Sequence, residues 1–123
     1  MTAAVTGISA ITLATHDMAR AVTFYETLGF ALKYGGADSA FTSFYAGSGF
    51  LNLIATDPDP DPDRPIQWWG RAIFYVEDVD AFHAKAVAAG LTPEFDPQDA
   101  PWGERYFHIA DPDGHDLSFA KPL

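Results

Sequence analysis

Two aspartate–glycine pairs at a constant interval limit the folds of this chain more than any other feature. Asp17 precedes and Gly29 follows one amphipathic stretch, and Asp78 and Gly90 bracket a second one in the same way. Aspartate caps the start of a helix and glycine ends one, so both stretches should be helical. The expected helices are 18–28 and 79–89. Asp78 lies 61 residues after Asp17, and Gly90 lies 61 residues after Gly29. This constant interval indicates an internal repeat.

Segments rich in β-branched and aromatic residues flank both helices, one before each helix and three after it. The expected strands are 8–14, 30–34, 41–46, 50–55, 72–76, 92–95, 105–110 and 116–120. Each half is too small to bury its own sheet face. The sequence therefore predicts an α+β fold in which two tandem βαβββ units form a curved mixed sheet around a cavity.

An acidic segment of alternating Asp and Pro separates the two halves. Because proline lacks the N–H that a helix interior or a central strand requires, we expect an extended linker. A calcium loop is the alternative, but the segment has neither the glycine nor the closing glutamate of such loops. We predict a single domain over 1–123, divided into a first unit at 7–55, the linker at 56–65 and a second unit at 66–122.

The chain is strongly acidic and contains no cysteine. Its net charge of −10 disfavours binding to nucleic acid or to anionic membranes, since both require basic residues. The absence of cysteine excludes disulfides, thiolate metal sites and a cysteine nucleophile. No basic cluster followed by an apolar run opens the sequence, and no stretch could span a bilayer, so we expect a cytoplasmic protein without a signal peptide.

Two motifs resemble those of a known family. Residues 15–30 read Thr-His-Asp-Met-Ala-Arg-Ala-Val-Thr-Phe-Tyr-Glu-Thr-Leu-Gly-Phe, and residues 111–119 read Asp-Pro-Asp-Gly-His-Asp-Leu-Ser-Phe. Together with the repeat, they are similar to the vicinal oxygen chelate superfamily, also called the glyoxalase/bleomycin-resistance/dioxygenase superfamily, over essentially the whole chain. The resemblance implies that each unit supplies a curved sheet and that the concave interior holds the active or binding site.

Metal-dependent members of this family hold a divalent cation with His and Glu ligands. The resemblance implies which positions of this chain correspond to those ligands. Those positions fall on Ala10, Asn52, Arg71 and Ser118. Ala10 has no donor atom, and Arg71 is a permanent cation. Asn52 and Ser118 offer only weak neutral oxygens. We therefore expect no metal ion and no other cofactor, as in a bleomycin-resistance-like member that lacks the metal ligands.

Aromatic residues, 15% of the chain, are the alternative lining for the cavity. Rings bind planar or cationic ligands by stacking and cation–π attraction, although tryptophans also pack in cores and dimer interfaces. Arg71 either anchors a ligand or forms an ion pair with a carboxylate, and His108 alternates onto the same face as Tyr106. Surface or capping roles are expected for His16, His83 and His115. The predicted ligand-binding residues are Phe50, Asn52, Trp68, Trp69, Arg71, Tyr75, Trp102, Tyr106, His108 and Ser118.

The combined features favour a metal-independent protein without catalytic residues. We expect it to sequester an aromatic or cationic small molecule, such as an antibiotic, as a homodimer with clefts between the chains. The alternative is an enzyme, a glyoxalase-like lyase or isomerase or a dioxygenase with a non-standard or absent metal site. Its metal-free version would use His108 and Tyr106 as acid–base groups.

Overall fold

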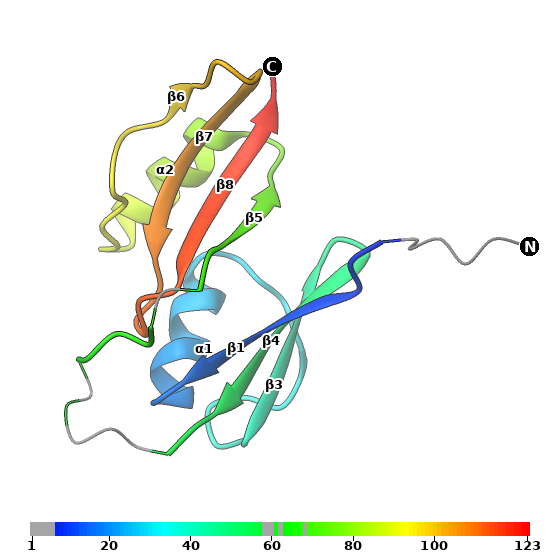
Figure 1. Ribbon diagram of the computed structural model, residues 1–123, viewed down its shortest axis with the longest axis vertical. Coiled ribbons are helices and arrows are strands. Elements are labelled where there is room, and N and C mark those ends of the chain that lie inside the picture. The colour runs from blue at the N-terminus through cyan, green and yellow to red at the C-terminus, as the bar shows by residue number, and fades with distance from the viewer. Residues whose placement is uncertain (1–6, 58–60, 62, 68) are drawn as a thin grey trace, which may run out of the picture.

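The chain folds into two similar units that lie against each other (Figure 1). The computed structural model describes residues 7–57, 61, 63–67 and 69–123. The first unit comprises β1 (Ala10–Thr15), α1 (Met18–Thr27), β2 (Leu32–Tyr34), β3 (Phe41–Ala46) and β4 (Gly49–Ala55). The second comprises β5 (Arg71–Tyr75), α2 (Val79–Ala88), β6 (Gln98–Asp99), β7 (Glu104–Ala110) and β8 (Asp116–Pro122). The predicted α+β class with tandem βαβββ units is confirmed.

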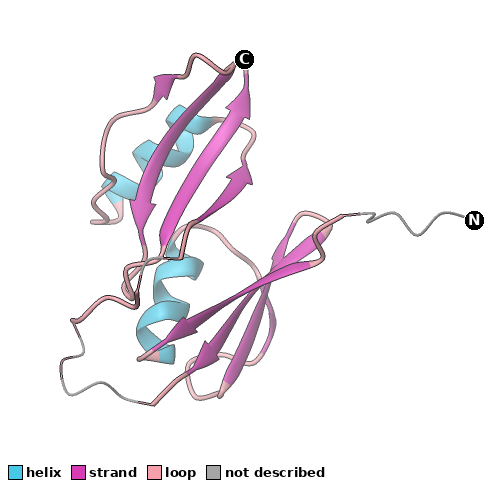
Figure 2. Cartoon of the chain, viewed as in Figure 1, coloured by secondary structure: helices cyan, strands magenta, loops and turns pink. Residues whose placement is uncertain are grey.

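Each unit packs one helix against a four-stranded mixed sheet (Figure 2). The strand orders, β1-β4-β3-β2 and β5-β8-β7-β6, are equivalent, and the first strand of each unit lies at an edge, parallel to the last. The side chains of Asp17 and Asp78 accept hydrogen bonds from backbone N–H groups three residues ahead, at 3.1 and 3.0 Å. Gly29 and Gly90 follow the helices with φ of 101° and 87°, a left-handed conformation that glycine adopts without strain.

Strand alternation gives the two faces of each sheet different surroundings. In the second sheet, Phe107, Ile109, Leu117 and Phe119 are buried on the helix side. The other face, which we call the open face, carries Ile73 and Tyr75, exposed by 61% and 66%. The first sheet repeats the pattern, with leucines buried against α1 and aromatic and aliphatic side chains exposed on its open face. The described part of the chain therefore leaves one face of each sheet uncovered.

Aromatic contacts join the cores of the two units. The ring of Phe30, just after α1, lies 5.3 Å from Phe74 of β5 and 6.4 Å from Phe119 of β8, measured between ring centroids. Phe82 of α2 lies 4.5 Å from Phe119 on the other side. Since these rings form one continuous cluster across the boundary between the units, we propose that the two units fold as a single domain.

A buried polar network also links the units, at the turn before β8. The hydroxyl of Tyr25 in α1 donates to Asp111 Oδ2 at 2.7 Å. Oδ1 of Asp111 accepts the backbone N–H groups of Asp113 and His115, both at 2.9 Å. The imidazole of His115 lies between the carbonyl oxygen of Ala14, 2.7 Å from Nε2, and the indole N–H of Trp69, 2.9 Å from Nδ1. These two contacts select the neutral tautomer that carries its proton on Nε2.

Three expectations are corrected by the structure. His115 is buried rather than at the surface, because both ring nitrogens have partners inside the protein. The side chain of His83 is only 15% exposed, because it packs edge-on against Phe107 at 5.0 Å. Residues 92–95 are irregular, because Pro93 cannot donate to a ladder and the pairing with β7 begins only at Gln98.

The described residues of the predicted linker at 56–65 belong to no helix or strand. Next to it, Gly114 has a φ of 85°, and a side chain there would meet the ring of Pro65, with Cβ only 2.6 Å from Pro65 Cβ. Neither α1 nor α2, the helices of the described chain, has the length and apolar character needed to cross a lipid bilayer.

Candidate ligand-binding site

Five of the predicted ligand-binding residues line one small cavity on the open face of the second sheet. Its volume is about 80 Å³. The lining residues are Arg71, Ile73, Trp102, Glu104, Tyr106, His108, Ser118 and Ala120. The register explains why they meet, because Ser118 lies directly between Ile73 on β5 and His108 on β7, and alternate residues of each strand point to the same face.

A row of aromatic rings forms one wall of this cavity. Ring centroids lie 5.3 Å apart between Trp102 and Tyr106, and 5.1 Å apart between Tyr106 and His108. Phe95 packs edge-on against the last two rings, at 5.5 and 5.1 Å. Trp102, in the turn before β7, is 65% exposed, and its indole N–H donates to Glu104 at 2.9 Å. The row presents flat surfaces on which a planar or cationic group can stack.

Charged residues gather at the other end of the cavity. Arg71 donates through Nε and Nη2 to the same oxygen of Asp116, Oδ2, at 2.9 and 2.7 Å. Nδ1 of His108 lies 3.8 Å from a carboxylate oxygen of Glu94. Burial, and secondarily the charge of Arg71, lowers the pKa of His108 below its ordinary value. The imidazole is therefore mostly neutral at pH 7, available as an acceptor or a base.

The other predicted residues do not join this cavity. Phe50 and Asn52 lie on the open face of the first sheet, where Lys33 Nζ stands 5.0 Å from the Phe50 ring centroid. Tyr75 is on the open face of the second sheet, beyond the cavity, and a hydrogen bond with Glu104 raises its pKa. Trp69 instead donates to His115. Trp68 lies outside the described residues.

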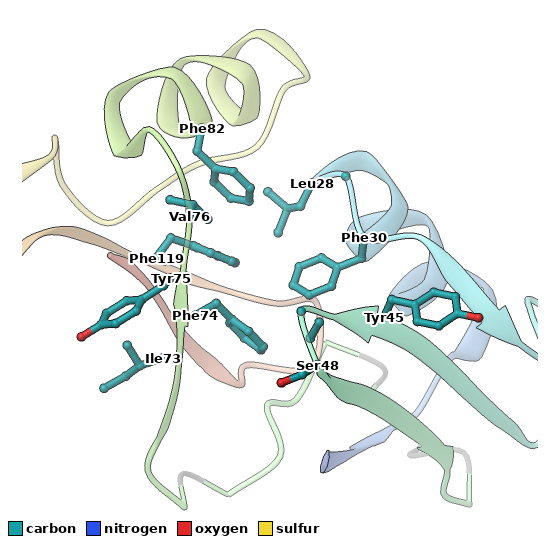
Figure 3. A pocket seen from close by; sticks show the side chains of 13 residues that line it. Leu28, Phe30, Tyr45, Ser48, Ile73, Phe74, Tyr75, Val76, Phe82 and Phe119 are labelled. Atoms are coloured by element: carbon teal, nitrogen blue, oxygen red, sulfur yellow. The ribbon is translucent and has the colours of Figure 1, made fainter. Parts of the chain in front are cut away.

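A larger cleft, lined mostly by apolar side chains, lies between the two units, and Tyr75 is the one predicted ligand-binding residue among its described lining residues. Its volume is about 460 Å³. Figure 3 shows Phe30 of the first unit facing Phe74 and Phe82 of the second. The labelled lining residues are Leu28, Phe30, Tyr45, Ser48, Ile73, Phe74, Tyr75, Val76, Phe82 and Phe119. The sequence predicted a cavity formed by the two units and named Tyr75, but it did not predict the other lining residues, because they depend on how the units pack.

The four positions that correspond to the family's metal ligands do not fit a metal ion. The side chain of Ala10 is a methyl group, and the amide of Asn52 donates to Thr12 Oγ1 at 3.2 Å. The guanidinium of Arg71 occupies a third position and would repel a divalent cation. The hydroxyl of Ser118 alone is too weak a ligand to hold one.

Sequence comparison finds relatives along nearly the whole chain. The model of the Glyoxalase/Bleomycin resistance protein/Dioxygenase superfamily matches residues 7–119. The putative glyoxylase CFP32 of Mycobacterium bovis is 33% identical over 109 residues, which cover 83% of this chain and 39% of that protein. The chain spans only 28 to 39% of the length of the curated mycobacterial relatives that it matches.

Solved structures of the same architecture include both an enzyme and a drug-binding protein. Lactoylglutathione lyase from Agrobacterium tumefaciens has a TM-score of 0.75 at 22% identity, covering 95% of this chain and 94% of that one. A bleomycin-binding protein complexed with bleomycin has a TM-score of 0.74 at 21% identity, covering 97% and 100%. Such identities establish a common fold and not a common activity. The match of the family model to residues 7–119 shows that the chain belongs to the glyoxalase/bleomycin resistance protein/dioxygenase superfamily.

Proposed function

We propose that the protein binds and sequesters an aromatic or cationic small molecule on the open face of its second sheet. The observation that carries the proposal is the cavity that brings Arg71, Trp102, Tyr106, His108 and Ser118 together beside a row of aromatic rings. The misfit of the family's metal positions favours binding over metal-dependent chemistry. The acidic chain, with a net charge of −10, favours a cationic ligand.

The size of the cavity supports a binding site shared between two chains. A volume of about 80 Å³ is far below the roughly 300–1,000 Å³ that drug-sized ligands occupy. The open faces of both sheets expose large apolar side chains. Such exposed apolar surfaces are typical of protein–protein interfaces. These side chains are Phe41, Tyr45, Ile54, Ile73 and Tyr75. We therefore propose a homodimer in which open faces meet and enclose the ligand.

The neighbour in complex with bleomycin suggests the first probe. Purified protein would be titrated with bleomycin and a panel of aromatic, cationic antibiotics while tryptophan fluorescence and heat are recorded. We expect saturable binding. Replacing Trp102 with alanine should weaken it by roughly 2- to 30-fold, the equivalent of one lost cation–π or stacking contact. The control is Val87→Ala, which changes an exposed side chain of α2, on the other side of the sheet.

Two outcomes would contradict the proposal. One is the absence of saturable binding for every compound of the panel. The other is an equal loss of affinity in the Trp102 and Val87 variants, because binding would then not involve the open face. Size-exclusion chromatography with light scattering tests the dimer separately, and a monomer at micromolar concentration would contradict the shared cleft.

One observation favours an enzyme as the second candidate. The largely neutral imidazole of His108 lies beside the phenol of Tyr106, with ring centroids 5.1 Å apart, and the guanidinium of Arg71 is near enough to lower the pKa of that imidazole. A base and an acid in one cavity can move protons on a bound ligand. Mass spectrometry of each ligand after incubation separates the two functions. A product that His108→Gln fails to form would establish catalysis.

A further inference from the structure

We propose that Glu94, His108 and Asp116 form a binding site for a divalent metal ion, displaced from the positions that the family uses. One imidazole nitrogen and two carboxylate oxygens, one atom from each residue, all lie within 4.8 Å of one another. Such a mixed nitrogen and oxygen set suits Zn²⁺, Ni²⁺ or Mn²⁺. The site goes beyond the proposed ligand binding: it shares His108 with that cavity, but metal binding does not depend on ligand binding.

The backbone holds the three residues at one end of the open face. His108 pairs with Ser118, and Ala110 pairs with Asp116, so His108 and Asp116 are diagonal neighbours on adjacent strands. The backbone N–H of Glu94 donates to the carbonyl oxygen of His108 at 2.9 Å, which fixes Glu94 beside β7 although it lies outside the sheet. The sequence alone did not place these residues together.

Small movements of the side chains would complete the site. Ligand atoms around a tetrahedral Zn²⁺ lie about 3.3 Å apart, given bonds of roughly 2.0–2.1 Å. The present separations of up to 4.8 Å must therefore shorten. The side chain of Glu94 is 47% exposed, whereas that of His108 is 14% exposed. Glu94 can therefore move the most, while His108 and Asp116 are held near each other by adjacent strands of the sheet.

An unsatisfied oxygen is the independent sign that this cluster lacks a partner. Asp116 is 9% exposed, and Arg71 binds only its Oδ2. Oδ1 is buried and has no hydrogen-bond partner among the described residues. Buried carboxylate oxygens rarely remain without a donor or a cation, because removal from water is costly. A metal ion bound by Oδ1 would remove this cost.

The charges near the cluster permit a cation and limit its affinity. Glu94 and Asp116 contribute two negative charges, and Arg71 cancels one of them through its ion pair with Asp116. The remaining negative charge attracts a divalent ion, while the nearby guanidinium opposes it. Replacing Arg71 with glutamine should therefore strengthen metal binding, the opposite of the effect expected if Arg71 were needed only to hold the site together.

The test is a calorimetric titration of the chelator-treated full chain with ZnCl₂ and NiCl₂. We expect saturable binding of one equivalent, weakened at least tenfold in His108→Ala and in Glu94→Gln. Because Glu94 is half exposed, Glu94→Gln is expected to fold like the wild type. The matched control is His83→Ala, which removes an imidazole 3.8 Å from the carboxylate of Asp96 and should leave the affinity unchanged. A shift of the His108 imidazole nitrogens in ¹⁵N NMR on adding Zn²⁺ locates the ion directly.

The proposal is overturned by heats that are absent, unsaturable or not stoichiometric, since the ion is then adventitious. Equal losses in the His83 and His108 variants, or an unchanged affinity in Glu94→Gln, overturn it as well. Repeating the antibiotic titration in the presence of EDTA distinguishes this site from the proposed function. Metal binding without antibiotic binding supports the site and refutes the function, and antibiotic binding without metal binding does the reverse.

Discussion

The hydrogen bond from Tyr25 to Asp111 joins the two units, and its contribution to the free energy of unfolding can be measured by mutation. Replacing Tyr25 with phenylalanine removes only the hydroxyl, which donates to Asp111 Oδ2 at 2.7 Å. The ring keeps its edge-on contacts with Phe24 and Phe30, at centroid distances of 5.2 and 5.5 Å. Both partners of the bond are buried, so water does not readily replace the lost donor.

The expected loss follows from the surroundings of Asp111. A hydrogen bond to a charged group contributes about 1.5–3 kcal/mol to stability. Oδ1 keeps its two backbone donors, and burial already raises the pKa of Asp111, so the carboxyl can take up a proton when Oδ2 loses its donor. We therefore expect the free energy of unfolding to fall by about 2 kcal/mol rather than more. This corresponds to roughly 6–10 °C in Tm for a chain of this length.

Urea denaturation followed by circular dichroism measures this loss. The control is Tyr34→Phe, because the side chain of Tyr34 is 63% exposed and its hydroxyl can bind water. If the two units form one domain, wild type and variants unfold in a single transition, and two transitions would contradict this. A loss below about 0.5 kcal/mol in Tyr25→Phe, or an equal loss in the control, would refute the reasoning from burial.

Three further predictions test other parts of the structure. Burial raises the pKa of Tyr25 above 10, so above pH 10 the folded chain keeps a proton that the unfolded chain loses. The stability of the wild type, measured by urea denaturation, should therefore fall as the pH rises above 10, and that of Tyr25→Phe should fall less. Gly103→Ala should cost about 1 kcal/mol through its left-handed φ of 94°, and Gly114→Ala more, since its new Cβ also meets a proline ring. Glu104→Ala should lower the pKa of Tyr75 toward 10 in an NMR titration, and an unchanged pKa would contradict the hydrogen bond.

Local signals in the sequence predicted the parts of the fold that depend on neighbouring residues. Asp17 and Asp78 cap the helices as expected, since capping involves only the next turn of the chain. Alternation correctly placed His108 and Tyr106 on one face and Phe107 on the other, because a strand has a fixed period of two.

Features that depend on contacts distant in the sequence could not be predicted. His115 looked like a residue of a surface turn, but its partners are Ala14 and Trp69, far away along the chain. The apolar cleft arises from the packing of Phe30 against Phe74, which the repeat cannot specify because it describes each unit separately. The cluster of Glu94 with His108 was missed because Glu94 was assigned to a strand that does not form.

The alternation of side chains in the second sheet has a consequence for how such a protein can change. Along β8, Leu117 and Phe119 belong to the core, while Ser118 and Ala120, which alternate with them, line the small cavity. Core residues and residues of the proposed binding site therefore alternate along the same strand. Ser118 and Ala120 are themselves only 4% and 1% exposed. A substitution that changes the proposed ligand site at either position must therefore keep a similar side-chain volume, or the packing of the second unit will suffer.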